Sequence, residues 1–370
     1  MSRLPLACDA SFAVSRTGSR PSTYFDEVLA RITEASHRSG FLIERDYRIA
    51  GRSVRLRSTG LALADSLTRA FAHLASGPGN EPSLTVYLAD GGVVSLPPSP
   101  WALPDPTPST AWARDESELI HVRDERVDGL FRLDGASVSM LDHVSGVGVF
   151  WTASRERVPR YERAAPLRAI LDWWGGDHGY RVVHAGAVGT ESGGALLTGK
   201  AGSGKSTAVL ACLGSGLSYA GDDGVAISHG ARPLIHSLYC TAKLEPGHLE
   251  RALPHLASVL EDSEEAHQGK RMFFLDRDRS SELTVGFPLR AVLLPRVTGS
   301  GRSTTRPVSA GTALLSLAPS TLFQIPGGRQ QRLHHMAEIL RRVPAYVLDL
   351  GNDLATVAPA IRAVLDGATH

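Results

Sequence analysis

The sequence of 370 residues predicts an α/β protein with a small N-terminal domain and a larger C-terminal domain. Apolar segments of strand-like composition alternate with segments whose apolar residues recur at helical spacing. Beyond residue 180 strands and helices follow one another closely. A proline-rich stretch at residues 91–110 interrupts the first half, and because proline fixes φ and lacks a backbone donor, we expect an extended connection there. The expected domains are residues 1–150 and 151–370.

The elements expected before residue 178 form a small mixed α+β unit and its connection to the second domain. They are helices at 24–39, 61–74 and 160–174, and strands at 47–57, 83–88, 130–133, 137–141 and 146–152. Asp134-Gly135 is a candidate hairpin turn, and Gly175-Gly176 is expected to end the third helix.

The second half predicts a sheet with helices between its strands. Strands are expected at 181–188, 194–197, 219–221, 225–228, 234–243, 287–295 and 346–350. Helices are expected at 205–213, 247–260, 333–342 and 355–366, with a polar excursion at 261–268.

Composition excludes several classes of function. With 39 Lys and Arg against 38 Asp and Glu, the formal net charge is +1, so no broad basic field is offered to nucleic acid or to an anionic membrane. No apolar run approaches the ~18 residues of a membrane span, and the N-terminus does not have the pattern of a secretory signal. Three widely separated cysteines form neither a disulfide framework nor a metal-ligand spacing. We therefore expect a cytoplasmic protein.

The strongest motif is Gly-Lys-Ala-Gly-Ser-Gly-Lys-Ser at residues 199–206, which has every fixed position of the phosphate-binding P-loop. An apolar strand leads into it and an amphipathic helix leads out, as the motif requires. In such loops glycines let successive N–H groups point at one anion, the lysine reaches the β- and γ-phosphates, and the hydroxyl is a ligand for Mg²⁺. The expected binding residues for ATP are Gly199, Ala201, Gly202, Ser203, Gly204, Lys205, Ser206 and Thr207, with Ser206 also on the metal.

Acidic and basic residues stand at fixed distances from Lys205. Asp222-Asp223 follows it by 17 residues, after a short apolar segment, and His184 precedes it by 21 residues on an apolar strand. Two adjacent carboxylates can divide the work of phosphoryl transfer, one ionised beside the metal and one acting as base.

Here the sequence resembles the HPr kinase/phosphorylases and their wider relatives. Val183-His184-Ala185, the P-loop and Ala220-Gly221-Asp222-Asp223 match the order and spacing of that family, well over about residues 180–228 and loosely over 160–370. The resemblance implies a core like that of phosphoenolpyruvate carboxykinase, with a mixed sheet, and transfer of a γ-phosphoryl group to a serine hydroxyl. Relatives of this type often form oligomers, so a homo-oligomer is an open expectation.

The resemblance also assigns roles. Asp222 would be the base, Asp223 would hold Mg²⁺ or its waters, His184 would lie beside them, and Arg290 would lie near the phosphates together with Lys205. The family's second signature, Glu-x-Arg-Gly-x-Gly, is missing, and residues 236–245 stand in its place. This argues against HPr as the substrate and against the reverse reaction, and favours divergent relatives such as the kinases that phosphorylate a lasso peptide.

Several other residues suit ordinary structural roles as well as functional ones. Met272 to Asp276 is an apolar run ending in an acid, as in motor or transporter ATPases, but Arg277 follows it where such enzymes use glutamate. No Asn-Lys-x-Asp supports guanine specificity. Surface, capping or packing roles suit Lys243, Glu245, Lys270, Arg271, Arg296, Trp101, Trp112, Trp173 and Trp174 equally well.

Three functions follow as hypotheses. The first is an ATP·Mg²⁺-dependent kinase acting on a hydroxyl of a peptide or protein, with a ribosomal peptide precursor as one such substrate. The second keeps the chemistry but uses a small-molecule acceptor, or is carboxykinase-like. The third is a nucleotide-gated binding module or ATPase without phosphotransfer, in which residues 1–150 recognise a partner.

Overall fold

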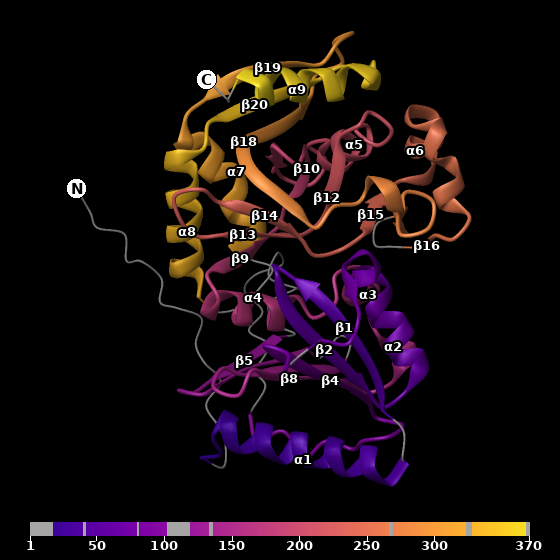
Figure 1. Ribbon diagram of the computed structural model, residues 1–370, viewed down its shortest axis with the longest axis vertical. Coiled ribbons are helices and arrows are strands. Elements are labelled where there is room, and N and C mark those ends of the chain that lie inside the picture. The colour runs from indigo at the N-terminus through magenta and orange to yellow at the C-terminus, as the bar shows by residue number, and fades with distance from the viewer. Residues whose placement is uncertain are drawn as a thin grey trace, which may run out of the picture.

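The structure is a computed structural model that describes residues 18–39, 42–79, 81–101, 119–132, 136–265, 269–322 and 328–367. It is an α/β protein in which two large mixed sheets lie one above the other along the long axis, with helices on their faces (Figure 1). Among the described residues, no helix is both long enough and apolar enough to cross a bilayer.

The first sheet has eight strands and is built from residues 43–152. Its order is Ala75–Ser76 (β3), Ile43–Ile49 (β1), Arg52–Ser58 (β2), Leu84–Asp90 (β4), Val147–Thr152 (β8), Ser137–Asp142 (β7), Val127–Arg132 (β6) and Leu119–Arg123 (β5). Alternate side chains of β4 enter different cores: Val86 and Leu88 pack on the side of Leu61–Thr68 (α2) and the 3₁₀ helix Arg69–Leu74. Tyr87 and Ala89 face Pro21–Ser39 (α1), which covers the other side.

The second sheet has nine strands and holds the P-loop. Its main path is Ser218–Gly221 (β12), Gly186–Thr190 (β10), Gly193–Leu197 (β11), Gly286–Val297 (β18), Leu234–Ser237 (β14), Val225–Ser228 (β13) and Tyr180–Val183 (β9), while Ala345–Leu350 (β20) and Thr304–Val308 (β19) extend it from β18. β11, β18 and β20 run parallel, so their carboxyl ends meet at one edge of the sheet.

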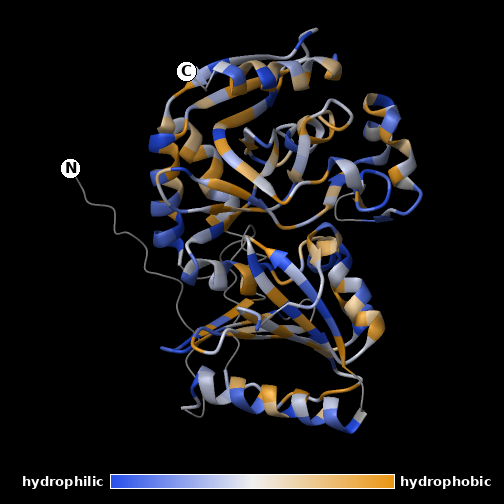
Figure 2. Cartoon of the chain, in the orientation of Figure 1, coloured by the Kyte–Doolittle hydropathy of each residue, from blue (hydrophilic) through white to orange (hydrophobic). Residues whose placement is uncertain are grey.

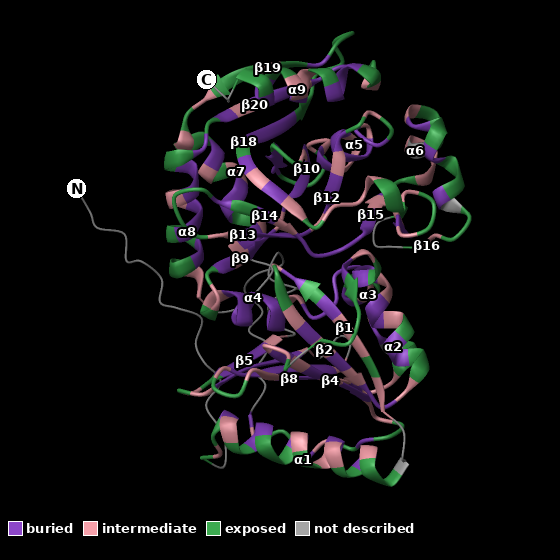
Figure 3. Ribbon diagram, viewed as in Figure 1, coloured by how far each residue is buried: buried purple, intermediate pink, exposed green. Residues whose placement is uncertain are grey.

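Helices cover both faces of this second sheet. Lys205–Leu210 (α5) and Val357–Gly367 (α9) pack on one face, and Ala310–Leu322 (α7) and Arg329–Arg342 (α8) pack on the other. The strands between them are buried, while the outer sides of α1 and α8 are exposed (Figure 3). The same helices carry polar residues outward and apolar residues inward (Figure 2).

A small third sheet lies beside α5. It consists of Thr241–Leu244 (β15), Arg271–Phe274 (β17) and Glu264–Glu265 (β16), and between its strands run Pro246–Ala252 (α6) and the 3₁₀ helix Pro254–Leu260. Leu244, Leu256 and Phe273 pack into the same core as α5. Short 3₁₀ helices also occur at Arg155–Arg157, Ser280–Glu282 and Leu354–Thr356.

The two large sheets are joined by Arg160–Ala164 (α3) and Arg168–Asp177 (α4), and one hydrophobic core reaches into both. The Phe71 and Tyr239 rings lie 5.6 Å apart between centroids. The Cys240 N–H donates to the Ala70 carbonyl at 2.9 Å, and His73 Nε2 lies 2.7 Å from the Ser237 hydroxyl. The first domain therefore packs against the segment between β14 and β15, where the small third sheet begins.

Several predicted elements are divided in the structure. The strand expected at 47–57 is the β1–β2 hairpin, which turns at Ala50-Gly51 with φ of 48° and 76°. Asn-Gly or Asp-Gly usually marks such a turn, whereas alanine seldom adopts positive φ. Because Ala50 stands in place of Asn or Asp, the sequence carries no turn signal here. The helix expected at 160–174 is broken at Pro166 and Leu167, the latter with φ of 58°.

The strand expected at 181–188 is also two strands. β9 ends at Val183 and pairs with β13, whereas β10 begins at Gly186 and pairs with β11 and β12. His184 therefore lies at a crossover between two regions of the sheet.

Gly175 does not end a helix as expected but lies within α4, where a Cβ would come within 2.2 Å of the Tyr180 ring. The expected strand at 234–243 likewise splits into β14 and β15, while β5 and α7 were not expected. Asp134-Gly135 and Trp112 lie outside the described residues.

Candidate functional site

The P-loop connects the end of β11 to the start of α5. Its entry is tied to the neighbouring parallel strand, because the Thr198 N–H donates to the Leu293 carbonyl at 2.9 Å. Gly204 immediately precedes the helix with φ of 91°, and a Cβ there would lie 2.4 Å from a methyl group of Leu350. A side chain at this position would meet both backbone strain and a buried leucine, so the motif's second fixed glycine is required by this fold.

The loop's lysine lies in a cluster of charged side chains. Lys205 Nζ is 2.9 Å from His184 Nε2 and 3.6 Å from Asp223 Oδ1. The same Asp223 oxygen is 3.1 Å from His184 Nε2, and Lys243 Nζ is 2.7 Å from the other Asp223 oxygen. The structure thus brings together the P-loop lysine and two of the residues predicted to lie beside it, His184 and Asp223, and Lys243 joins them from β15.

His184 cannot satisfy both of its neighbours at once. Burial and the Lys205 charge lower the pKa of His184 to about 4, so the ring is neutral at pH 7. A single unprotonated Nε2 could accept from Lys205, and a protonated Nε2 could donate to Asp223, but one nitrogen cannot do both. Its Nδ1 is buried and has no hydrogen-bond partner among the described residues. An anion that attracted Lys205 would resolve this conflict in favour of the Asp223 contact.

The two carboxylates have opposite electrostatic surroundings. Burial raises the pKa of Asp222 above its usual value, and the nearby Asp223 charge adds to this effect while Lys205 opposes it. Burial alone would also raise the pKa of Asp223, but Lys243, His184 and Lys205 outweigh it and hold that pKa well below the usual range. Asp223 is therefore the ionised partner of the pair.

Asp222 and Asp223 also point to different places. Asp222 is 1% exposed, it interacts with the Ser206 hydroxyl, and one of its oxygens accepts from the Lys243 N–H at 3.3 Å. Its other oxygen is buried without a partner among the described residues. The Asp223 side chain is 25% exposed and lines a cavity. The Asp222 carboxylate thus lies against the Ser206 hydroxyl, and the Asp223 carboxylate faces the open space.

Two cavities flank the loop. The acid-side cavity, of about 320 Å³, lies between the loop and the small sheet, and ionisable residues line it: Lys205, His184, Asp223, Lys243, Glu245, His248 and Lys270. The α7-side cavity, of about 890 Å³, lies between the loop, the carboxyl end of β18 and α7. All of Gly199 to Thr207 lines the first cavity, whereas only Gly199 to Ser203 lines the second.

The site suits a metal ion that arrives with phosphate. Ser206 and the unpartnered Asp222 oxygen are hard oxygen donors of the kind that Mg²⁺ prefers. No cluster of three or more His, Cys, Asp or Glu side chains suited to a metal is present in the described part of the chain. Mg²⁺ is usually held by one or two carboxylates plus substrate phosphates, so this donor set fits it in company with a nucleotide.

Arg290 is not part of this cluster. Its Nε donates to the Ser192 carbonyl at 3.3 Å, and it stacks on Gly193 at the amino end of β11, while the P-loop follows the carboxyl end. The prediction that Arg290 lies near the phosphates is wrong, because residue 290 lies near the start of the paired region of β18 and only residues 294–297 reach the loop.

Several other residues considered in the sequence analysis have contacts typical of structural roles. Asp276 lies 3.5 Å from Arg69 and lines neither cavity, so it has the contacts of a structural acid. Arg296 lines the α7-side cavity but pairs with Asp349 at 2.7 Å. Trp173 and Trp174 are buried in the core that the two sheets share, and Trp101 is buried against α1.

Sequence reasoning missed three residues near the loop. His248 Nε2 is 3.2 Å from the Thr207 hydroxyl, and Val297 and Leu315 are exposed apolar side chains beside the loop. No motif marks them, since their positions depend on how β18, α6 and α7 pack.

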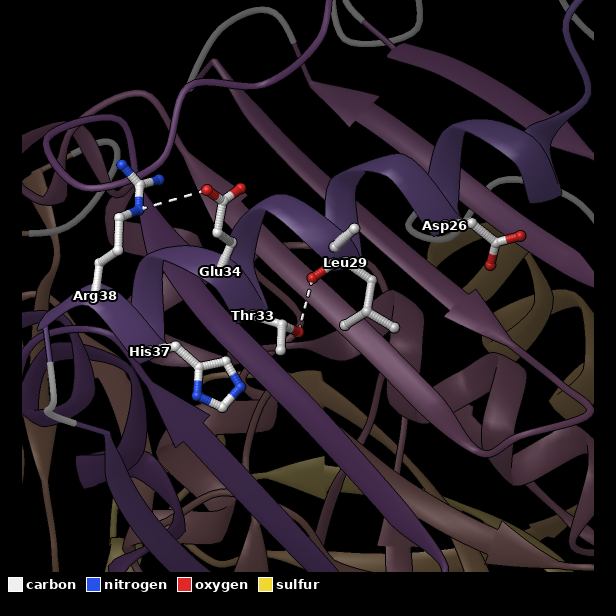
Figure 4. Close-up of a pocket in the computed structure, with 7 residues that line it drawn as sticks. Asp26, Leu29, Thr33, Glu34, His37 and Arg38 are labelled. Carbon is white, nitrogen blue, oxygen red and sulfur yellow. Dashed lines mark hydrogen bonds and ion pairs between the residues drawn. The ribbon is translucent and has the colours of Figure 1, made fainter.

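A further hollow lies on the outer side of α1 (Figure 4). It has a volume of about 760 Å³, and its lining residues, among them Asp26, Leu29, Thr33, Glu34, His37 and Arg38, all belong to that one helix. Within the helix the Thr33 hydroxyl donates to the Leu29 carbonyl at 2.9 Å, and from outside the helix Arg126 pairs with Asp26 at 2.5 Å. Because the hollow is lined by one helix face alone, the P-loop region remains the candidate site.

Comparison with models of known protein families and with curated proteins finds no match for this chain. The function must therefore be inferred from the geometry of the site itself.

Proposed function

We propose that the protein is an ATP·Mg²⁺-dependent phosphotransferase that transfers the γ-phosphoryl group to a serine or other hydroxyl of a peptide or protein. One observation carries the proposal: the P-loop lysine, His184 and Asp223 converge within 3.6 Å of one another at the wall of a single cavity. A carboxylate beside the P-loop lysine that reaches solvent could orient an acceptor hydroxyl for phosphoryl transfer.

Each residue has a role in this proposal. Lys205 and the backbone of the loop would bind the phosphates, and Ser206 with Asp222 would hold Mg²⁺. When bound, Mg²⁺ would neutralise charge on the β- and γ-phosphate oxygens. His184 would hold Asp223 in position once Lys205 turned toward the phosphates, because Nε2–H could then donate to Asp223 without a competing ammonium.

We assign the base to Asp223, since it lines the cavity that an acceptor must enter, and the metal side to Asp222. The acceptor hydroxyl would give its proton to an Asp223 oxygen while its own oxygen bonds to the γ-phosphorus. The bond from that phosphorus to the β–γ bridging oxygen would break, leaving ADP. Phosphoryl transfer depends mainly on positioning and charge neutralisation, so a carboxylate of low pKa suffices to orient the hydroxyl.

A small-molecule acceptor is the second candidate, favoured by the size of the acid-side cavity. At about 320 Å³ it has the volume of an ordinary small-ligand site and is bounded by Lys243, Glu245 and Lys270. A peptide would have to present its hydroxyl at the mouth of this space.

The test is incubation with γ-labelled ATP, Mg²⁺ and either a peptide panel or a metabolite panel, followed by mass spectrometry. We expect a product heavier by one phosphoryl group with the wild type and none with Lys205→Ala. A phosphorylated metabolite instead of a peptide would select the second candidate. ADP and inorganic phosphate without any phosphorylated product across both panels would contradict phosphotransfer and support the nucleotide-gated module.

A further inference from the structure

The α7-side cavity is separate from the carboxylate pair, although both adjoin the P-loop. Its walls come from the carboxyl end of β18, from β20 and from α7, and its floor is the first half of the loop. Parallel α/β sheets bind ligands outside the carboxyl ends of their strands, and β11 and β18 end together at this edge.

The order of the strands gives the site two sides. β12, which leads to Asp222-Asp223, lies on one side of β11 beyond β10, and β18 and β20 lie on the other. A triphosphate that crosses the loop with its terminal phosphate beside Asp223 therefore directs its nucleoside toward β18 and β20. Resting on the proposed function, we propose that the α7-side cavity binds the nucleobase of the phosphoryl donor.

The chemistry of the walls agrees with a flat, apolar ring. The large apolar residues of the lining are Leu294, Pro295, Val297, Leu315, Pro319 and Val347. Leu315 is 79% exposed and Val297 is 64% exposed, and they stand on different elements, α7 and β18, at the same cavity. When a ligand covers large apolar side chains that are exposed beside a cavity, the removal of apolar surface from water favours binding.

The charged residues at this cavity do not compete for that role. Arg296 pairs with Asp349 at 2.7 Å, and Lys200 belongs to the loop and faces both cavities. The acid-side cavity is the poorer place for a base, because four charged side chains line it, those of Asp223, Lys243, Glu245 and Lys270, and only Leu244 and Val297 add large apolar surface.

The experiment compares two ligands that share the phosphates and differ in the base. Affinities of Mg²⁺·ATP and Mg²⁺·tripolyphosphate are measured by calorimetry for the wild type, Leu315→Ser and Val297→Ser. Leu61→Ser serves as the matched control, since Leu61 is an exposed leucine on α2, at 55%. We expect Leu315→Ser to weaken ATP about fivefold, the loss of ~40 Å² of covered apolar surface, and to leave tripolyphosphate unchanged. Leu61→Ser should change neither affinity.

Equal ATP affinity in Leu315→Ser, Val297→Ser and the wild type would overturn the inference, and so would an equal loss for ATP and tripolyphosphate. Because both side chains are exposed, a melting temperature within a few degrees of the wild type identifies variants that are properly folded. Wild-type protein that binds neither ligand would overturn the proposed function as well. Tight ATP binding that depends on Lys205 but not on Leu315 or Val297 would overturn only the placement of the base.

Discussion

The sharpest test of the site is the substitution Asp223→Asn, which keeps the size of the side chain and removes its charge. In the structure this charge faces Lys243 at 2.7 Å, Lys205 at 3.6 Å and a neutral His184. Asp223 therefore competes with any phosphate for Lys205, and it is also the proposed base. The substitution should affect binding and transfer in opposite directions.

The size of each effect follows from the geometry. Two unit charges 3.6 Å apart interact by about 5 kcal/mol at an effective dielectric constant of about 20. Lys243 and solvent offset most of this, so we expect a net gain of about 1–2 kcal/mol, or about tenfold tighter ATP binding. Loss of the base should slow phosphoryl transfer about 10²–10⁴-fold. Calorimetry gives the first quantity, and single-turnover transfer from γ-labelled ATP gives the second.

Asp222→Asn is the matched control, because it changes the neighbouring carboxylate in the same way. It should raise the Mg²⁺ concentration needed for half-maximal ATP binding about 10–100-fold, as loss of a metal-side carboxylate does. The reasoning is refuted if Asp223→Asn is the variant that loses Mg²⁺ dependence while Asp222→Asn binds Mg²⁺·ATP normally but fails to transfer. The roles would then be those expected from the sequence.

Other predictions concern stability and nucleotide binding. Arg332→Met should lower the free energy of unfolding by about 3–5 kcal/mol in denaturant titrations, because Asp172 is 0% exposed and would lose its 2.7 Å partner; adding Asp172→Leu should restore part of the loss. Burial opposes charging of His143, but hydrogen bonds to Asp128 and Asp177 outweigh it and raise its pKa to about 9. Its stabilisation is therefore full below about pH 6.5 and is lost as pH rises through 9, at a cost of about 2–3 kcal/mol that His143→Gln should abolish. A His143→Gln protein with the wild-type pH profile would contradict this. Lys205→Ala should lose the rise in melting temperature that saturating ATP gives the wild type, worth about 2.7 kcal/mol at 100 times Kd, and a retained rise would exclude the P-loop as the binding site.

Hydrophobic periodicity and turn residues correctly predicted the helices and strands whose positions depend on nearby residues in the sequence. Helix α1, strand β11 and strand β20 lie where hydrophobic periodicity and turn residues placed them. The failures were interruptions inside apolar runs: Ala50 at positive φ at the tip of the β1–β2 hairpin, and Leu167 at positive φ between α3 and α4. In each, tertiary packing stabilises a backbone conformation that the residue itself does not favour.

The site was predictable to the extent that it depends on spacing along the chain. Lys205, His184 and Asp223 meet because short connections link β9, β10 and β11, and the P-loop and α5 then lead from β11 to β12. The distribution of Asp222 and Asp223 between loop and cavity was not predictable, since it depends on which way each side chain points at the end of β12. Lys243 and Leu315 reach the loop from separate elements, so no sequence distance to Lys205 could reveal them.

The core that joins the two sheets has a consequence for cooperativity. With Phe71 against Tyr239 and a backbone hydrogen bond from Cys240 to Ala70, neither half can unfold without exposing apolar surface of the other. By thermodynamic linkage, a nucleotide bound at the P-loop then protects strands that it never touches. Slower amide exchange in β2 and β4 would report occupancy of a site on the other sheet, and residues 151–370 alone would leave Tyr239 and Trp174 without part of their packing.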